Sequence, residues 1–201
     1  MNGTIVIVDD DPIIRMDIRE MLEEAGYTVA GEAKNGEEAI ERIARLAPDL
    51  VVMDVKMPIM NGIKASRIIR RMQDQDTSIL LLTAYSQRDL VQDARDAGVS
   101  AYLVKPITEA ELIPAVEIAL SQREKMKAMR QELETLKLSM EERKTIERAK
   151  GRLMKTCSLD EEEAYRRMRA ASMAERIPLA TLAERMLADG EQRWSDKLTR
   201  G

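Results

Sequence analysis

Carboxylates follow two apolar segments in the first third of the chain. Three aspartates, residues 9–11, come directly after the run Thr4–Val8, and Asp54 ends the run Leu50–Met53. Short, mostly β-branched runs of this kind are typical of strands buried on both faces of a parallel sheet. The carboxyl ends of such strands form the edge where ligands bind. Carboxylates gathered there repel one another unless a cation lies among them, and their oxygens suit Mg²⁺. Asp54 is thus a candidate metal ligand or nucleophile, although by itself it is more simply a solubilising residue at a strand end.

Two further apolar segments end on residues that suit a phosphoryl group. The run Ser78–Leu82 leads into Thr83, and the run Ala101–Val104 leads into Lys105. If these segments are parallel strands, their end residues lie at the same edge as the aspartates. A cationic side chain and a hydroxyl are the partners that phosphoryl oxygens need. The set therefore indicates phosphoryl chemistry assisted by a metal ion.

Strands and helices alternate along the first part of the chain. Turn residues such as Gly26 and the pair Asn35-Gly36 separate the segments. We expect strands at residues 4–8, 28–33, 50–54, 78–82 and 101–104, and helices at 13–25, 37–46, 63–72 and 87–97. This alternation predicts an α/β fold with a doubly wound parallel sheet.

The composition excludes several kinds of chemistry. The 201 residues include no histidine and a single cysteine, Cys157, so neither a histidine-ligated metal site nor an internal disulfide can form. No apolar run approaches the roughly 20 residues that span a bilayer, and no signal peptide opens the sequence. We therefore expect a cytoplasmic protein without membrane attachment.

Charge is distributed unevenly along the chain. Residues 1–121 hold 13 basic and 21 acidic side chains, whereas residues 122–201 hold 19 basic and 15 acidic side chains. This asymmetry indicates a regulatory site for metal or phosphate joined to a module that binds a polyanion. Two solvated surfaces of unlike charge are the alternative interpretation.

The first 121 residues resemble the receiver domain of bacterial two-component response regulators. The resemblance rests on Asp9-Asp10, Asp54 before Met57-Pro58, Thr83-Ala84, and Tyr102 three residues before Lys105-Pro106. It implies a flavodoxin-like domain with a five-stranded parallel sheet, which accepts a phosphoryl group from a sensor histidine kinase. The domain would catalyse its own phosphorylation and dephosphorylation, and no separate enzymatic site is expected.

The same resemblance implies a role for each residue of the set. Asp54 would be the phosphoryl acceptor. Oxygens of Asp10, Asp54 and the backbone carbonyl of Lys56 would bind Mg²⁺, with Asp9 assisting. Thr83 and Lys105 would hold the phosphoryl oxygens. Tyr102 would be the aromatic switch that responds to phosphorylation.

A long helix is expected after the receiver. Pro114 fits the first turn of that helix, where a missing N–H is tolerated, and no further Gly or Pro appears until Gly151. We expect residues 122–141 to form a coiled-coil linker that makes a homodimer on phosphorylation, and an amphipathic helix packed on its own receiver is the alternative. The apolar residues of the a/d seam, spaced alternately by three and four, are Met126, Met129, Leu133, Leu136 and Met140.

Residues 142–190 have the pattern of three short helices. The second helix is expected to open with the capping box Ser158–Glu161, and the third to start at Ile177-Pro178. Gly151 lies inside the first helix, where it costs about 1 kcal/mol relative to Ala, so we expect something to approach its backbone closely. Residues 191–201 are polar and form a tail.

This module resembles the ANTAR domain, the RNA-binding module of transcription antiterminators. The resemblance rests on Ala149-Lys150-Gly151 with Met154, Glu163-Ala164-Tyr165, Arg169, Ala174 and Leu182-Ala183. The whole chain looks most like the ethanolamine-utilisation antiterminator type. That resemblance implies a phosphorylation-activated regulator that binds an RNA stem-loop in an mRNA leader and prevents a terminator hairpin from forming.

Basic side chains of the module are candidates for binding RNA phosphates. Arg152 and Arg167 are charged at positions that are usually apolar in ANTAR domains. Tyr165 is the only aromatic residue of the module, and we expect it in the core rather than stacked on a base. The candidate RNA-binding residues are Lys144, Arg148, Lys150, Arg152, Lys155, Arg166 and Arg169.

Two other functions remain open from the sequence. A DNA-binding response regulator is the main alternative, because three short helices also form a helix-turn-helix. Against it, the segment shows no compact helix-turn-helix pair with a glycine in the turn. A signalling adaptor that binds only protein is the third interpretation. Salt-dependent binding to nucleic acid would separate the adaptor from the other two.

Overall fold

The chain divides into two units, each described by itself below. The computed structural model describes residues 3–72, 76–84, 93 and 97–188. Residues group by their contacts into Met1–Met129 and Arg130–Gly201. The helix expected at residues 87–97 and the tail at 191–201 fall largely or wholly outside the described residues.

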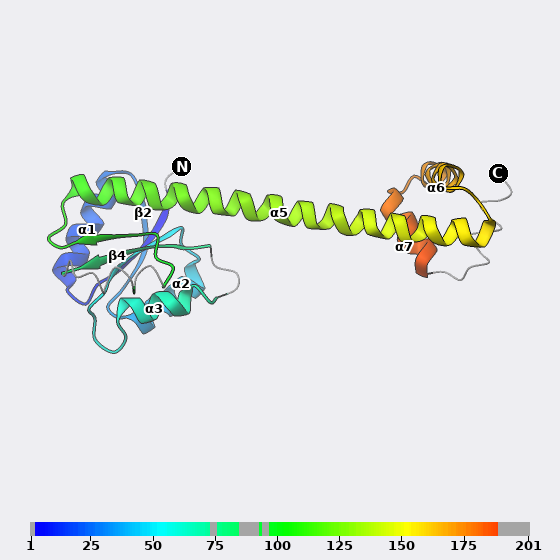
Figure 1. The fold of residues 1–201 in the computed structure, drawn as a ribbon. Helices are drawn as coiled ribbons and strands as arrows, with labels where there is room; N and C mark the ends of the chain where they lie inside the picture. The colour runs from blue at the N-terminus through cyan, green and yellow to red at the C-terminus, as the bar shows by residue number, and fades with distance from the viewer. Residues whose placement is uncertain (1–2, 73–75, 85–92, 94–96, 189–201) are drawn as a thin grey trace. The chain divides into compact units, whose positions relative to one another are not determined.

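A five-stranded parallel sheet forms the centre of the first unit (Figure 1). Its strands run in the order β2-β1-β3-β4-β5, and every neighbouring pair is parallel. This arrangement confirms the predicted flavodoxin-like α/β fold. The five strands are β1 (Thr4–Val8), β2 (Thr28–Ala33), β3 (Leu50–Asp54), β4 (Ser78–Thr83) and β5 (Ala101–Val104).

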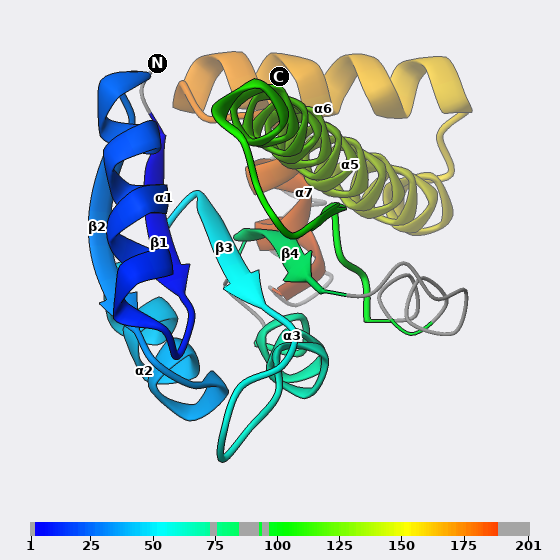
Figure 2. The same cartoon turned by 90° about the vertical axis from the view of Figure 1, so that its left-hand side faces the viewer.

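Helices cover both faces of this sheet (Figure 2). On one face, α1 (Pro12–Glu24) and the first turns of α5 (Glu109–Cys157) pack against β1, β3 and β4 through apolar side chains such as Ile18 and Val116. On the other face, α2 (Gly36–Leu46) and α3 (Gly62–Ile69) do the same through Ile43 and Ile69. All five residues of β3 are buried, as expected for a central strand between two helical layers.

Helix α5 spans Glu109–Cys157, and it begins earlier than Pro114 indicated. A capping box sets the start, because the carboxylate of Glu111 accepts hydrogen bonds from the backbone N–H and the hydroxyl of Thr108, at 3.2 and 2.8 Å. Pro114 therefore lies in the second turn rather than the first. The helix continues through the predicted linker and into the second unit without a break.

The second unit is a small three-helix module. The end of α5 packs against α6 (Glu161–Glu175) and α7 (Leu179–Ala188), as seen in Figure 1. The buried side chains of its core are Ala149, Leu153, Ala164, Met168, Leu182, Ala183 and Met186. Over the described residues, no helix of either unit combines the length and apolarity needed to cross a lipid bilayer.

The cap of α6 differs from the predicted capping box. Ser158 has a left-handed backbone (φ 52°) directly after the last residue of α5, so it terminates that helix instead of starting the next. The N-cap of α6 is Asp160, whose side chain accepts a hydrogen bond from the backbone N–H of Glu163 at 2.8 Å.

Candidate functional site

Two carboxylates and one ammonium group meet at the carboxyl edge of the sheet. Nζ of Lys105 lies 2.6 Å from Oδ2 of Asp9 and 2.8 Å from Oδ1 of Asp54. The three residues come from the ends of β5, β1 and β3, so the lysine side chain reaches past β4 to the centre of the sheet. Both carboxylates are almost fully buried, with 1% of Asp9 and 5% of Asp54 exposed. The sequence predicted Mg²⁺ among these carboxylates and Lys105 as a partner for phosphoryl oxygens, and in the structure the ammonium of Lys105, 19% exposed, lies between the two carboxylates.

The loop after β3 holds the second carboxylate oxygen of Asp54. The backbone N–H of Lys56 donates to Oδ2 of Asp54 at 2.9 Å. Gly62 lies over the end of β3, where an added Cβ would come within 2.3 Å of the backbone oxygen of Asp54. Only glycine fits there, so the Asn61-Gly62 turn that the sequence shows is also what lets this loop close over the aspartate.

Asp9 is fixed by the turn that follows β1. Its Oδ1 accepts a hydrogen bond from the backbone N–H of Asp11 at 3.0 Å, and Arg15 donates to its backbone oxygen at 2.7 Å. Asp11 itself caps α1 by accepting from the backbone N–H of Ile13 at 2.8 Å. The third aspartate of the triplet therefore serves the helix, whereas the first faces the site.

The ionisable groups of the site shift one another's pKa. Burial raises the pKa of the Asp54 carboxyl, while the hydrogen bonds from Lys105 and from the Lys56 N–H act in the opposite direction. Burial alone would lower the pKa of Lys105, but its hydrogen bonds to Asp54 and Asp9 outweigh this and raise it. Lys105 is therefore a cation at neutral pH, and the site stabilises positive charge between its carboxylates.

The other predicted site residues differ in position and exposure, and Tyr102 lies within β5, opposite Leu81, rather than at the carboxyl edge. Thr83 ends β4 and is 4% exposed, and its backbone oxygen accepts from the N–H of Lys105 at 2.8 Å. Asp10 and the side chain of Lys56 are exposed, and Tyr102 on β5 is 45% exposed. Within the described residues, no three acidic, histidine or cysteine side chains form a ready metal cluster. The structure thus brings Asp9, Asp54 and Lys105 together, with Asp10 exposed beside them.

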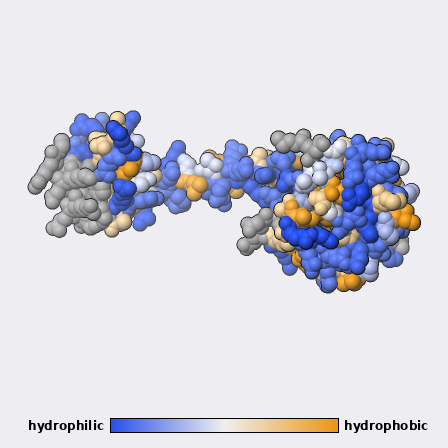
Figure 3. All heavy atoms as spheres, turned by 180° about the vertical axis from the view of Figure 1, so that it is seen from behind, coloured by the Kyte–Doolittle hydropathy of each residue, from blue (hydrophilic) through white to orange (hydrophobic). Residues whose placement is uncertain are grey.

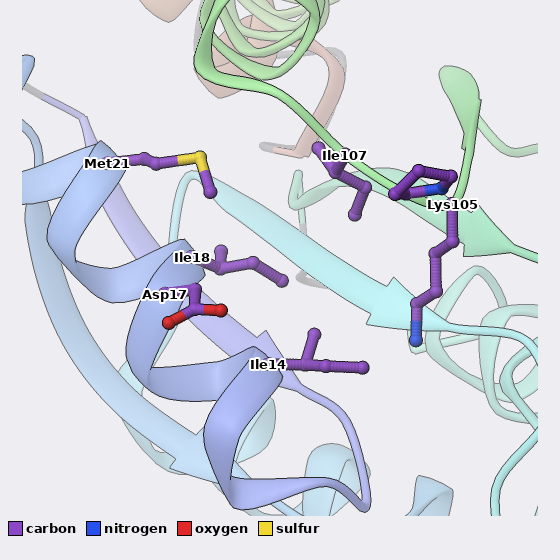
Figure 4. Close-up of a pocket in the computed structure, with 7 residues that line it drawn as sticks. Ile14, Asp17, Ile18, Met21, Lys105 and Ile107 are labelled. Carbon is purple, nitrogen blue, oxygen red and sulfur yellow. The ribbon is translucent and has the colours of Figure 1, made fainter.

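A pocket of about 390 Å³ adjoins the site on the α1 side. In Figure 4, side chains of α1 point toward the segment that follows β5, and the side chain of Lys105 extends from its wall toward the end of β3. The pocket is mostly apolar, and it could not be predicted from the sequence because its two walls are about 90 residues apart in the chain. Its lining residues are Ile14, Asp17, Ile18, Met21, Lys105, Pro106 and Ile107.

Two of the seven predicted RNA-binding residues, Lys150 and Arg152, make ion pairs or hydrogen bonds within the second unit. Lys150 is only 7% exposed, and its Nζ lies 2.7 Å from carboxylate oxygens of both Glu147 and Glu161. Arg152 donates to the backbone oxygens of Met186 and Leu187 at 3.3 and 3.1 Å, where it caps the end of α7. The interpretation of these two side chains as free to bind phosphate does not fit their positions. The predicted residues whose side chains are exposed are Lys144, Arg148, Lys155, Arg166 and Arg169.

Two other residues of the second unit, Gly151 and Tyr165, have fewer close neighbours than the sequence indicated. Among the described residues, a Cβ added to Gly151 would meet nothing within 4 Å, so no packing by that part of the chain requires glycine there. Tyr165 is 43% exposed, so the expectation that its ring belongs to the core is wrong.

The predicted coiled-coil seam is an exposed apolar strip on α5. Its five residues, Met126, Met129, Leu133, Leu136 and Met140, are each 53–65% exposed. Figure 3 shows hydrophobic side chains among hydrophilic ones on the surface of this part of the helix.

Comparison with known proteins identifies both units. Residues 5–117 match the response regulator receiver domain, and residues 134–187 match the ANTAR domain. Transcriptional regulatory protein PdtaR of Mycobacterium tuberculosis is 45% identical over 183 residues, which are 91% of this chain and 88% of that protein.

Two solved structures resemble the first unit. A LuxR-family two-component response regulator from Aurantimonas sp. aligns with 61% of this chain and 88% of its own, at 37% identity and a TM-score of 0.58. The CheX-CheY-BeF3-Mg²⁺ complex from Borrelia burgdorferi covers 56% of this chain and 85% of its own, at 26% identity and a TM-score of 0.54. The chain therefore belongs to the response regulators in which a receiver domain is joined to an ANTAR domain.

Proposed function

We propose that this protein is a phosphorylation-activated regulator whose ANTAR module binds structured RNA and antiterminates transcription. The observation that carries the first half is the Lys105 ammonium held between Asp9 and Asp54 at the edge of the sheet. The match to the ANTAR domain and the exposed basic side chains of the second unit support the other half.

Asp54 is the phosphoryl acceptor in this proposal. One of its carboxylate oxygens forms a bond to phosphorus while the bond from phosphorus to the donor's leaving atom breaks, and the leaving group takes a proton from solvent. Lys105 then exchanges its ion pair with the Asp54 carboxylate for the phosphoryl oxygens, and the hydroxyl of Thr83 donates to them as well. Water later hydrolyses the acyl phosphate and restores the carboxylate.

The donor groups at the site fit Mg²⁺. The carboxylates of Asp10 and Asp54 and the backbone carbonyl of Lys56 would hold it, with the buried carboxylate of Asp9 assisting. The site already accommodates a cation between its two buried carboxylates, which supports this assignment. When bound, the ion neutralises negative charge during the transfer. The solved structure from Borrelia burgdorferi is a complex with BeF3 and Mg²⁺, and we propose the same metal ion for this chain.

A sensor histidine kinase is the proposed phosphodonor. The phosphohistidine has to come within bonding distance of Asp54, so the donor protein must cover the carboxyl edge of the sheet. Ile13 and Met16 at the start of α1 are 64% and 59% exposed, and the apolar pocket lies farther along the same helix. These exposed apolar side chains give the donor a surface beside the acceptor.

Phosphorylation then favours a homodimer through the exposed seam on α5, with Tyr102 as the residue that responds to the phosphoryl group. The seam has only two to three heptads, so its dimer is marginal until the receiver biases it. We assign residues 1–121 to the receiver, 122–141 to the coiled-coil linker, 142–190 to the ANTAR module and 191–201 to the tail. The cytoplasm is where this regulator would meet its transcripts.

The RNA target is proposed to be a stem-loop in an mRNA leader, as in the ethanolamine-utilisation antiterminator type. Lys144, Arg148, Gly151 and Lys155 are spaced by four, three and four residues, so they share one exposed face of α5. The cations would hold phosphates on either side of Gly151, where the missing side chain leaves room for the RNA backbone.

Two measurements test this function. Incubation with acetyl phosphate and Mg²⁺ should add one phosphoryl group to the wild type and none to Asp54→Asn, measured by intact-protein mass spectrometry. The phosphorylated protein should then bind a stem-loop RNA more tightly than a DNA duplex of equal length, with an affinity that falls as salt rises. Labelling of Asp54→Asn would overturn the acceptor, and tighter binding to the duplex would favour a DNA-binding regulator.

A further inference from the structure

We propose that the exposed face of α6 is a base-stacking site, on which the ring of Tyr165 receives an unpaired nucleobase of an RNA loop. The inference rests on the RNA binding proposed above and assigns one ligand group, the planar base, to one side chain. Neighbouring arginines of α6 hold the phosphates on either side of that base.

The ring of Tyr165 is held at the surface by the packing beneath it. Ala164 and Met168 on the inner face of α6 are fully buried, whereas Tyr165 is 43% exposed. Figure 2 shows α5 and α7 on one side of α6. The pair between Lys150 and Glu161 joins the first turn of α6 to α5. The helix that carries the ring is therefore fixed, which lowers the entropy lost when a base stacks on it.

The face of α6 that carries the ring has acidic side chains before it and cationic and apolar side chains after it. Tyr165, Arg169 and Met173 are spaced by four residues and so share one face of α6, and Met173 is 71% exposed. Arg166, next to Tyr165 in the sequence, pairs with Glu163, and Arg176 caps the far end of the helix. Glu161 and Glu162 lie one turn before the ring. An aromatic ring with Arg166 and Arg169 within one turn of it attracts a polyanion that carries flat π-faces.

This combination suits a nucleobase better than a peptide. Base–aromatic stacking tolerates any base, because each has a π-face, and guanidinium groups bind phosphate while also stacking on bases. The seam proposed for the homodimer is on α5, so the α6 face does not have to serve a second copy of the chain. The exposed cations of α5 supply phosphate contacts, and Tyr165 adds the stacking contact that those cations lack.

The test compares Tyr165→Phe with Tyr165→Leu in the full-length phosphorylated protein. The probe is an RNA hairpin with an unpaired all-adenosine loop, measured by fluorescence anisotropy at fixed salt, and circular dichroism checks the helices. We expect Tyr165→Phe to bind within about twofold of the wild type, because it keeps the ring. Tyr165→Leu should bind about 5- to 100-fold more weakly. A hairpin with abasic loop positions should bind both variants equally.

A matched pair of charge variants separates stacking from phosphate binding. Arg169→Ala removes one cation beside the ring, and we expect it to reduce the slope of log affinity against log salt by about 0.7. Arg45→Ala removes an exposed cation of the receiver and should leave that slope unchanged.

Each outcome decides between the two proposals. If the wild type binds the hairpin and Tyr165→Leu binds equally well, the stacking site is wrong while RNA binding stands. If Tyr165→Phe loses as much affinity as Tyr165→Leu, the hydroxyl rather than the ring makes the contact, and stacking is again wrong. If the wild type binds no hairpin RNA, the proposed function fails and the stacking site fails with it.

Discussion

Nζ of Lys105 lies 2.8 Å from Oδ1 of Asp54, although the two residues end strands that are separated by β4. This contact joins the proposed acceptor to the cation that would stabilise its phosphorylated form. It also means that the lysine has to exchange one anion for another during each phosphorylation.

Replacing this lysine should therefore slow phosphorylation. We expect Lys105→Met to lower the rate of labelling by acetyl phosphate at least about tenfold, because a positioned cation at a phosphoryl group is lost. Time-resolved mass spectrometry measures the rate. Lys34→Met removes an exposed lysine that pairs with Glu38 and should label like the wild type. Equal rates for the two variants would contradict the role of Lys105.

Gly151→Ala should separate helix stability from RNA binding. The added methyl group meets nothing within 4 Å, so the variant should be more stable by about 0.5–1 kcal/mol, measured by urea unfolding. If RNA approaches the backbone at this point, the same variant should bind the stem-loop more weakly. A more stable protein with unchanged RNA affinity would remove Gly151 from the proposed contact.

Charges placed in the α5 seam should prevent dimerisation. Leu133→Asp combined with Leu136→Asp would bury carboxylates in the interface, so we expect a folded monomer in the presence of beryllium fluoride as a phosphoryl mimic. Leu138→Asp is the matched control, since Leu138 is 61% exposed but lies outside the seam. Light scattering reports the molar mass, and a dimer that survives the double substitution would refute the seam.

Acid should weaken the network around Asp49 at the amino end of β3. Although burial raises the pKa of this carboxyl, hydrogen bonds from Thr4 and the charge of Arg123 outweigh it and lower the pKa. The folded pKa is below the unfolded pKa of about 3.9, so this stabilisation is complete above that pH and is lost as pH falls through the folded pKa.

The corresponding measurement is urea unfolding of the wild type and Asp49→Asn between about pH 7 and pH 3. We expect the variant to be less stable at neutral pH, with the difference shrinking below about pH 4. Asp17→Asn, at an exposed position of α1, should follow the wild type. A difference that stays constant across the range would show that Asp49 contributes no charge-dependent stability.

Most of the receiver could be predicted because its signals are local. Continuous β-branched runs ending in aspartate, threonine or lysine are visible in the sequence, and parallel pairing brings their ends to one edge. The start of α5 was harder to predict from the sequence. Pro114 indicates that the helix begins just before it, whereas the capping box of Thr108 and Glu111 starts the helix at Glu109.

The roles of the basic residues could not be read from spacing. Arg152 is spaced by four and three residues from the exposed Arg148 and Lys155, and Lys150 lies between them in the sequence. Lys150 meets Glu161, and Arg152 meets the end of α7, only once the chain has folded back. Tyr165 was misplaced for a related reason, because aromatic residues are buried on average and the sequence does not show how narrow a three-helix core is.

Because α5 is one continuous helix from Leu133 to Cys157, the number of residues between the seam and the output module sets the direction in which the module faces around the helix axis. The dimer seam and the first helix of the module belong to the same α-helix, so each residue added between them rotates the module relative to the seam by about 100°. One residue inserted near Glu142 would point the module in another direction without altering either surface. Seven inserted residues would nearly restore the direction, since two turns take 7.2 residues. Antitermination by a dimer should therefore depend periodically on linker length.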